Sequence, residues 1–88
     1  MHTVELLDEA MDLARKLGYD VRLEAVEGHA GSCVVAGRKL LFVDVAASPA
    51  ERLETVLEAL GEEVGTNAQP DAWTTSPTLR RLVGQRAA

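Results

Sequence analysis

The chain has 88 residues and a formal net charge of −5, and 47% of its residues are hydrophobic. This length allows one domain with one core, and the composition is that of a globular protein rather than a disordered one. Apart from Arg80, Arg81 and Arg86 near the C-terminus, basic residues are few and scattered. We therefore expect no nucleic acid partner, because phosphate binding requires a concentrated basic surface.

Cysteine content and segment hydrophobicity indicate the cellular compartment. The single cysteine, Cys33, excludes an internal disulfide bond. No apolar run approaches the roughly eighteen residues that span a membrane. The first residues, Met1 to Glu5, lack the basic and apolar segments of a signal peptide. We expect a cytoplasmic protein that does not associate with membranes.

The first predicted element is a helix over residues 3–17. Its apolar residues fall on one half of the helical cylinder and its charged residues on the other. Acidic residues precede basic ones, which suits the helix dipole. Gly18 then supplies the left-handed residue that commonly ends a helix.

Three strands are predicted next. Residues 19–26 alternate between apolar and polar side chains, which is typical of an edge strand with one wet face. Further strands are expected at 32–36 and 39–45. They are joined by a turn at Gly37 and Arg38, where the leading glycine favours a type II′ hairpin.

A second helix is predicted over residues 49–64. Ser48 is its expected N-cap, Pro49 fits the first helical position, and Glu51 completes a capping box with Ser48. An apolar stripe with helical spacing follows, which indicates one face packed on a core.

Ser76 and Pro77 repeat the cap-and-proline signal and predict a short helix over residues 77–83, ended by Gly84. The order of elements is therefore α-β-β-β-α-α within a single domain, 1–88. We predict an α+β fold in which the first two helices pack a three-stranded, mainly antiparallel sheet, with the short helix at its margin.

The chain offers little for metal or nucleophilic chemistry. A zinc site requires three or four ligands, and this sequence has only His2, His29 and Cys33 as nitrogen or sulfur candidates. We expect no metal, no cofactor and no catalytic residues, with Cys33 acting as a small hydrophobic strand residue. An unrecognised enzyme that uses Cys33 and His29 remains an alternative, as thiol activation by a nearby base is not readable from spacing.

An acidic stripe runs along the second predicted helix. Glu54, Glu58 and Glu62 are spaced four residues apart, so their carboxylates share one helix face. The simplest interpretation is a solvated face. The alternative is a docking stripe for a basic partner, including the chain's own Arg80 and Arg81.

The predicted hairpin has apolar residues on both faces. Val34 lies in one strand and Phe42 in a consecutive apolar run of the other. Two helices can cover only one face, and an apolar patch left open commonly marks an interface. We expect self-association as a two-fold dimer that uses Phe42, Val34 and Trp73. In the competing account, residues 66–83 wrap over the second face and Trp73 plugs their loop onto the core.

The order of elements resembles the core of the ImmA/IrrE-type zinc metallopeptidases. In that family a hairpin strand leads through a serine-containing turn into a helix bearing HExxH. Here the strand Leu41–Val45 leads through Ser48–Arg52 into the helical segment Leu57–Gly61.

The resemblance implies a scaffold without its catalytic metal site. Glu58 falls on the family's general-base position, and Leu57 and Gly61 fall on the positions of the two metal-binding histidines. Neither residue can ligate zinc. We therefore expect a non-catalytic interaction or scaffold domain, or alternatively a small-molecule or peptide binder on this degenerate scaffold.

Overall fold

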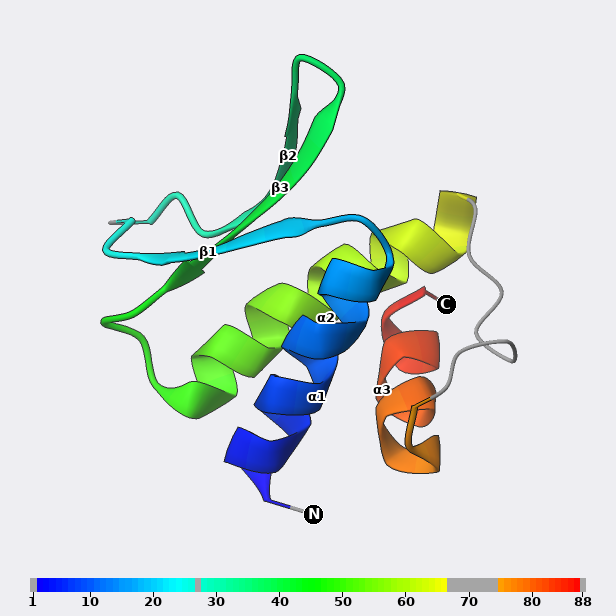
Figure 1. Cartoon of the computed structure of the whole chain (residues 1–88). Helices are drawn as coiled ribbons and strands as arrows, with labels where there is room; N and C mark the ends of the chain where they lie inside the picture. Colours follow the sequence, from blue (N-terminus) through cyan, green and yellow to red (C-terminus); the bar gives the residue numbers. More distant parts are fainter. Residues whose placement is uncertain (1, 27, 67–74, 88) are drawn as a thin grey trace.

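The computed structural model describes residues 2–26, 28–66 and 75–87 (Figure 1). Three helices and three strands follow the predicted order, and most of their ends lie within two residues of the predicted ones. The last helix is longer than predicted because it continues through Gly84. The elements are α1 (Thr3–Lys16), β1 (Asp20–Glu24), β2 (Gly31–Val35), β3 (Arg38–Asp44), α2 (Pro49–Thr66) and α3 (Pro77–Ala87).

The three strands form a mixed sheet of order β1-β3-β2. β2 runs antiparallel to β3, whereas β1 runs parallel to β3, so the expectation of a mainly antiparallel sheet requires this correction. Two parallel strands need a long connection between them, and here the segment that contains β2 connects β1 to β3. The continuous apolar run Leu40–Val43 explains why β3 is central, since a central strand is covered more completely than its neighbours.

All three helices lie on one side of the sheet (Figure 1). α1 and α2 pack against it, and α3 packs against α2 and touches α1. Leu41 and Val43 of β3 are fully buried and connect the sheet to the helical core. The helices contribute the remaining large buried side chains, among them Leu6, Leu7, Leu13, Leu53, Val56, Leu60, Leu79 and Val83. None of the described helices is both long and apolar enough to cross a membrane.

The β2–β3 turn differs from the predicted type II′ turn at Gly37 and Arg38. Val35 pairs with Arg38, so the two turn residues are Ala36 and Gly37. Both have positive φ, 51° and 81°, which is the pattern of a type I′ turn. The predicted turn was wrong by one residue. Gly37 occupies the second turn position, and Ala36, with a left-handed backbone, occupies the first.

The helix ends follow the sequence signals. Gly18, with φ of 98°, ends α1 in a Schellman motif, in which the N–H groups of Gly18 and Tyr19 bond to the carbonyls of Arg15 and Ala14 at 3.0 Å. At the start of α3, the Ser76 hydroxyl accepts the N–H of Leu79 and donates to Glu9 of α1. The cap of α3 therefore also joins α3 to α1.

The capping box of α2 gives the first testable prediction. The Glu51 N–H donates to Ser48 Oγ at 3.2 Å, and the Ser48 N–H and hydroxyl donate to Glu51 Oε1 at 3.3 and 2.9 Å. We expect Ser48→Ala to lower the free energy of unfolding by about 1 kcal/mol, because it removes the acceptor for an otherwise unpaired helix N–H. Urea denaturation followed by circular dichroism measures this change.

Ser48→Asn is the matched control, since asparagine retains a side-chain acceptor and is an equally good N-cap residue. An unchanged denaturation midpoint for Ser48→Ala would show that the cap contributes nothing to stability.

Candidate functional site

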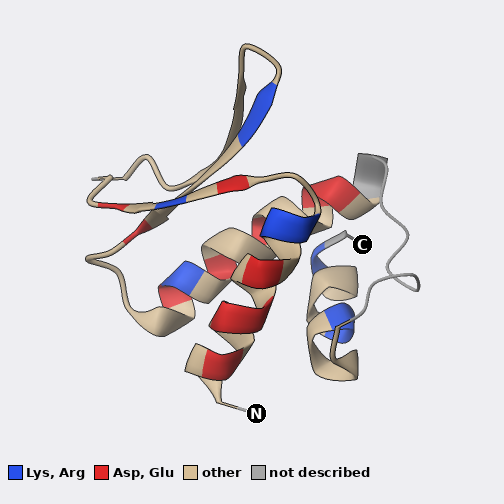
Figure 2. Cartoon of the chain, viewed as in Figure 1, with Lys and Arg blue, Asp and Glu red and all other residues tan. Residues whose placement is uncertain are grey.

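β2 is an edge strand whose two valines are largely exposed. Within the described residues it pairs only with β3, which leaves its other edge open. Val34 and Val35 point to opposite faces of the sheet, and they are 68% and 55% exposed. β2 carries no charged residue (Figure 2). Charges, prolines and bulges are the usual protection of edge strands against pairing, and β2 has none of them.

β1, at the opposite edge of the sheet, is charged. Asp20, Arg22 and Glu24 alternate along it. Asp20 Oδ2 accepts hydrogen bonds from Arg22 at 3.0 and 3.1 Å and from Arg38 of β3 at 3.1 Å. The hydrogen bond to Asp20 raises the pKa of Arg22 above its ordinary value. The two edges of the sheet therefore differ in chemistry.

We call the sheet surface turned away from the helices the outer face. Leu41 and Val43 point toward the helices, so Leu40 and Phe42 point to the outer face. By register, Cys33 lies beside Leu40 there. Phe42 is half-buried, and no described helix covers this face (Figure 1). Since Val34 points to the helix side, the predicted interface residues Phe42 and Val34 lie on opposite faces of the sheet.

Two sequence predictions fall outside the part of the chain that the structure describes. Trp73, the third predicted interface residue, is one of them. The other is the wrapping of residues 66–83 over the second face, of which only the ends can be followed. Within that range, α3 begins at Pro77 and packs on α2 instead of on the outer face.

His29 and Cys33, the residues of the enzyme alternative, both line a hollow on the outer face, and no hydrogen bond joins them among the described residues. The hollow has a volume of about 440 Å³ and is lined by the connection from β1 to β2 and by Phe42. Its lining is mostly apolar, and both His29 and Cys33 are exposed. The described residues contain no group of three or more His, Cys, Asp or Glu side chains placed to hold a metal ion.

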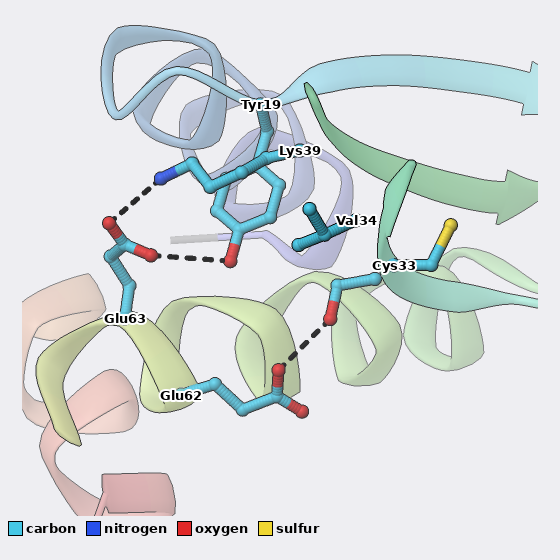
Figure 3. A pocket seen from close by; sticks show the side chains of 7 residues that line it. Tyr19, Cys33, Val34, Lys39, Glu62 and Glu63 are labelled. Atoms are coloured by element: carbon cyan, nitrogen blue, oxygen red, sulfur yellow. Dashed lines mark hydrogen bonds and ion pairs between the residues drawn. The ribbon is translucent and has the colours of Figure 1, made fainter. Parts of the chain in front are cut away.

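A polar cluster of Tyr19, Lys39 and Glu63 lies on the helix side of the sheet (Figure 3). Lys39 Nζ donates to Glu63 Oε1 and to the carbonyl of Leu17, both at 2.8 Å. The same ammonium lies 4.5 Å from the centre of the Tyr19 ring, within cation–π range. Lys39 thus connects β3, the end of α1 and the last turns of α2.

The cluster borders a second hollow of about 430 Å³, directly beneath the β2 edge. Ser32, Val34 and Glu62 also line it, and the Ser32 hydroxyl donates to Glu62 Oε2 at 3.0 Å (Figure 3). Burial, followed by the negative charges of Glu63 and Glu62, raises the pKa of Tyr19 to about 12. Every polar group of the cluster already has a partner within the chain. The cluster therefore holds β3, the end of α1 and the end of α2 together.

Sequence reasoning missed this cluster. The sequence pattern places Tyr19 only in a strand and does not single out Lys39 or Glu63. A lysine next to an apolar strand run was the available signal, because such a lysine packs its stem on the core and directs its ammonium to a carboxylate.

The acidic stripe of α2 is divided between two partners. Glu54 and Glu58 form ion pairs with Arg86 of α3, and Glu62 contacts Ser32 of β2. The alternative interpretation named Arg80 and Arg81 as possible partners within the chain, and the structure pairs Glu54 and Glu58 with Arg86 instead. These pairs are solvent-exposed, so each contributes at most about 1 kcal/mol to stability.

The three positions that carried the metallopeptidase resemblance lie on α2. Leu57 and Gly61 are buried, whereas Glu58 lies on the surface toward α3. Comparison of the chain with protein-family models, curated proteins and solved structures gave no match.

The raised pKa of Tyr19 can be measured directly by titration. Tyr19 is the only tyrosine, so the phenolate absorbance reports its ionisation alone. We expect the ultraviolet absorbance of the phenolate to rise with a midpoint near pH 12. The unfolded chain ionises near pH 10. Since the folded state holds its proton more tightly, the free energy of unfolding should fall as the pH rises from about 10 to 12.

Glu63→Gln is the control for the electrostatic contribution. It removes a carboxylate that opposes ionisation, so the Tyr19 midpoint should move toward 10 while burial keeps it above that value. A midpoint near 10 in the folded parent protein would contradict the placement of Tyr19 in the cluster.

Proposed function

We propose that this chain is a non-catalytic interaction domain that self-associates through its β-sheet as a two-fold dimer. The observation that carries the proposal is the state of β2. Its open edge lacks charge, and Val34 and Val35 are exposed on its two faces. Strand edges of this kind pair with other chains.

The distribution of charge also supports the sheet as the contact. Acidic residues are concentrated on α1 and α2, whereas the tip of the β2–β3 hairpin carries only Arg38 and Lys39 (Figure 2). Two copies with net charge −5 repel each other least where acidic residues are absent. β2 is such a place.

Sedimentation equilibrium tests the proposal. At micromolar concentration we expect a mass of twice the 9.4 kDa of one chain, falling toward 9.4 kDa on dilution. A mass of 9.4 kDa at every concentration up to the millimolar range would refute self-association.

The hollow on the outer face favours a second candidate, a binder of small apolar molecules or peptide side chains. Its volume of about 440 Å³ lies in the range of small-molecule sites, and Phe42 provides an aromatic wall. A fragment screen followed by nuclear magnetic resonance would support it if the shifted amides cluster at residues 28–33 and at Phe42. Shifts scattered over the surface, or none, would remove this candidate.

A further inference from the structure

We propose that the dimer forms by pairing of β2 with β2 of a second copy, antiparallel, with the two-fold axis at Cys33. Two three-stranded sheets would then form one continuous sheet. This inference rests on the self-association proposed above, and it assigns the surface and the register.

The hairpin turn determines which backbone groups of β2 are available. Residues that flank a two-residue turn bond to each other, so the N–H and C=O of Val35 point toward Arg38 in β3. Because these groups alternate along a strand, those of Cys33 also point toward β3, and those of Ser32 and Val34 point to the open edge. Ser32 and Val34 therefore carry the groups that a partner strand would bond.

The length of β2 selects the register. β2 spans five residues, Gly31–Val35, and Cys33 is its midpoint. Antiparallel pairing centred on Cys33 places Ser32 opposite Val34 of the second copy and Val34 opposite its Ser32, so all the outward groups of both strands are bonded. Pairing centred on Ser32 or on Val34 leaves part of each strand without a partner. The first register is therefore the most complete one.

Side-chain sizes match across this register. On the helix side, the exposed Val34 meets the smaller Ser32 of the second copy. On the outer face, Val35 meets Gly31 of the second copy, and the row continues to Phe42, with which Gly31 is paired. An aromatic side chain across from a strand glycine covers the space that the glycine leaves. The apolar residues of the two copies thus become continuous.

β1 cannot replace β2 at this interface. Two β1 strands paired about Arg22 would place Arg22 opposite Arg22 and Asp20 opposite Glu24, and like charges directly opposite each other destabilise a sheet. Pairing β1 of one copy with β2 of the next would leave an open edge at each end and add copies without limit. Pairing through β2 closes the assembly, and the two remaining edges are charged β1 strands.

Packing of two outer faces against each other is also less favourable. It would bury the Asp20 carboxylate with Arg22 and Arg38, and removing such ion pairs from water costs more than the pairing regains unless the geometry is excellent. Edge pairing leaves this face in water, as antiparallel sheets commonly do.

Cysteine cross-linking tests the register, because Cys33 is the only cysteine and is exposed. In the proposed register, Cys33 and its copy form a non-hydrogen-bonded pair with Cα atoms about 4.5 Å apart, which a disulfide can bridge. Air oxidation with copper–phenanthroline should convert the dimer into a disulfide-linked dimer that retains its circular dichroism spectrum.

The control is the double variant Cys33→Ser, Val35→Cys. It keeps one exposed cysteine on the same strand face but moves it two residues from the axis. The two thiols would then be offset by roughly 13 Å along the strands, beyond disulfide reach. The cross-link should be lost, while the sedimentation mass stays that of the dimer.

Val34→Glu tests the same edge without cysteine chemistry. Within its own chain position 34 is largely exposed and lies in register with Lys39, while Glu62 and Glu63 border the same hollow, so we expect the chain to remain folded with somewhat lower stability. In the dimer the new carboxylate would lie beside Ser32 and Glu62 of the second copy, where like charges repel. The mass should fall to 9.4 kDa at concentrations where the parent is dimeric. Val4→Glu, at an exposed position on α1, should leave the mass unchanged.

The outcomes separate this inference from the function it rests on. A dimeric mass without a Cys33 cross-link, or one that persists in Val34→Glu, overturns the β2 pairing but leaves self-association standing. If Phe42→Glu abolishes the dimer and Val34→Glu does not, the two sheets pack face to face, and this result also overturns the β2 pairing. A parent mass of 9.4 kDa throughout defeats self-association itself.

Discussion

The sheet depends on one strand for its attachment to the helices. β3 alone places fully buried side chains, Leu41 and Val43, against α1 and α2. β1 and β2 are held at its sides by backbone hydrogen bonds and contribute less to the core. Because α3 lies behind α2, no third helix extends the covered area toward β2 (Figure 1). The exposure of Val34 and Val35 follows from this arrangement of layers.

Lys39 fixes the position at which the β2–β3 hairpin leaves the helices. Its ammonium joins the end of α1 through Leu17 and the end of α2 through Glu63, and it lies over the Tyr19 ring. The hairpin therefore leaves the helical body at a point fixed by charge-assisted hydrogen bonds, and its tip extends beyond the helices (Figure 1). These bonds hold the β2 edge in one orientation, which would lower the entropy cost of the pairing proposed above.

Local signals in the sequence predicted local structure well. The capping box at Ser48, the glycine end of α1 and the serine cap before Pro77 are each decided within a few residues, and each is confirmed. The central place of β3 could have been derived from its continuous apolar run. Its parallel pairing with β1 could not, because strand order is set by packing of distant segments.

The candidate site was predicted only in part, for the same reason. The sequence marked Val34 and Phe42 as apolar hairpin residues, but their placement on opposite faces depends on register, and the turn residues shifted by one position from the expected ones. A shift of one residue inverts every side chain of a strand. The Tyr19–Lys39–Glu63 cluster joins residues up to 44 positions apart, so the lysine beside the apolar run of β3 could indicate a carboxylate partner but not which one.

The difference between the two sheet edges connects the composition of the chain to its proposed role. A chain with net charge −5 is protected from indiscriminate association, and β1 carries part of that protection in Asp20 and Glu24. β2 lacks it over its whole length. A single charged residue at the exposed position 34 would protect the β2 edge from pairing with other chains at little cost to the stability of the fold. The sequence has valine there instead. In the proposed dimer, an open edge of five residues opposite a charged one would allow one pairing and no further growth.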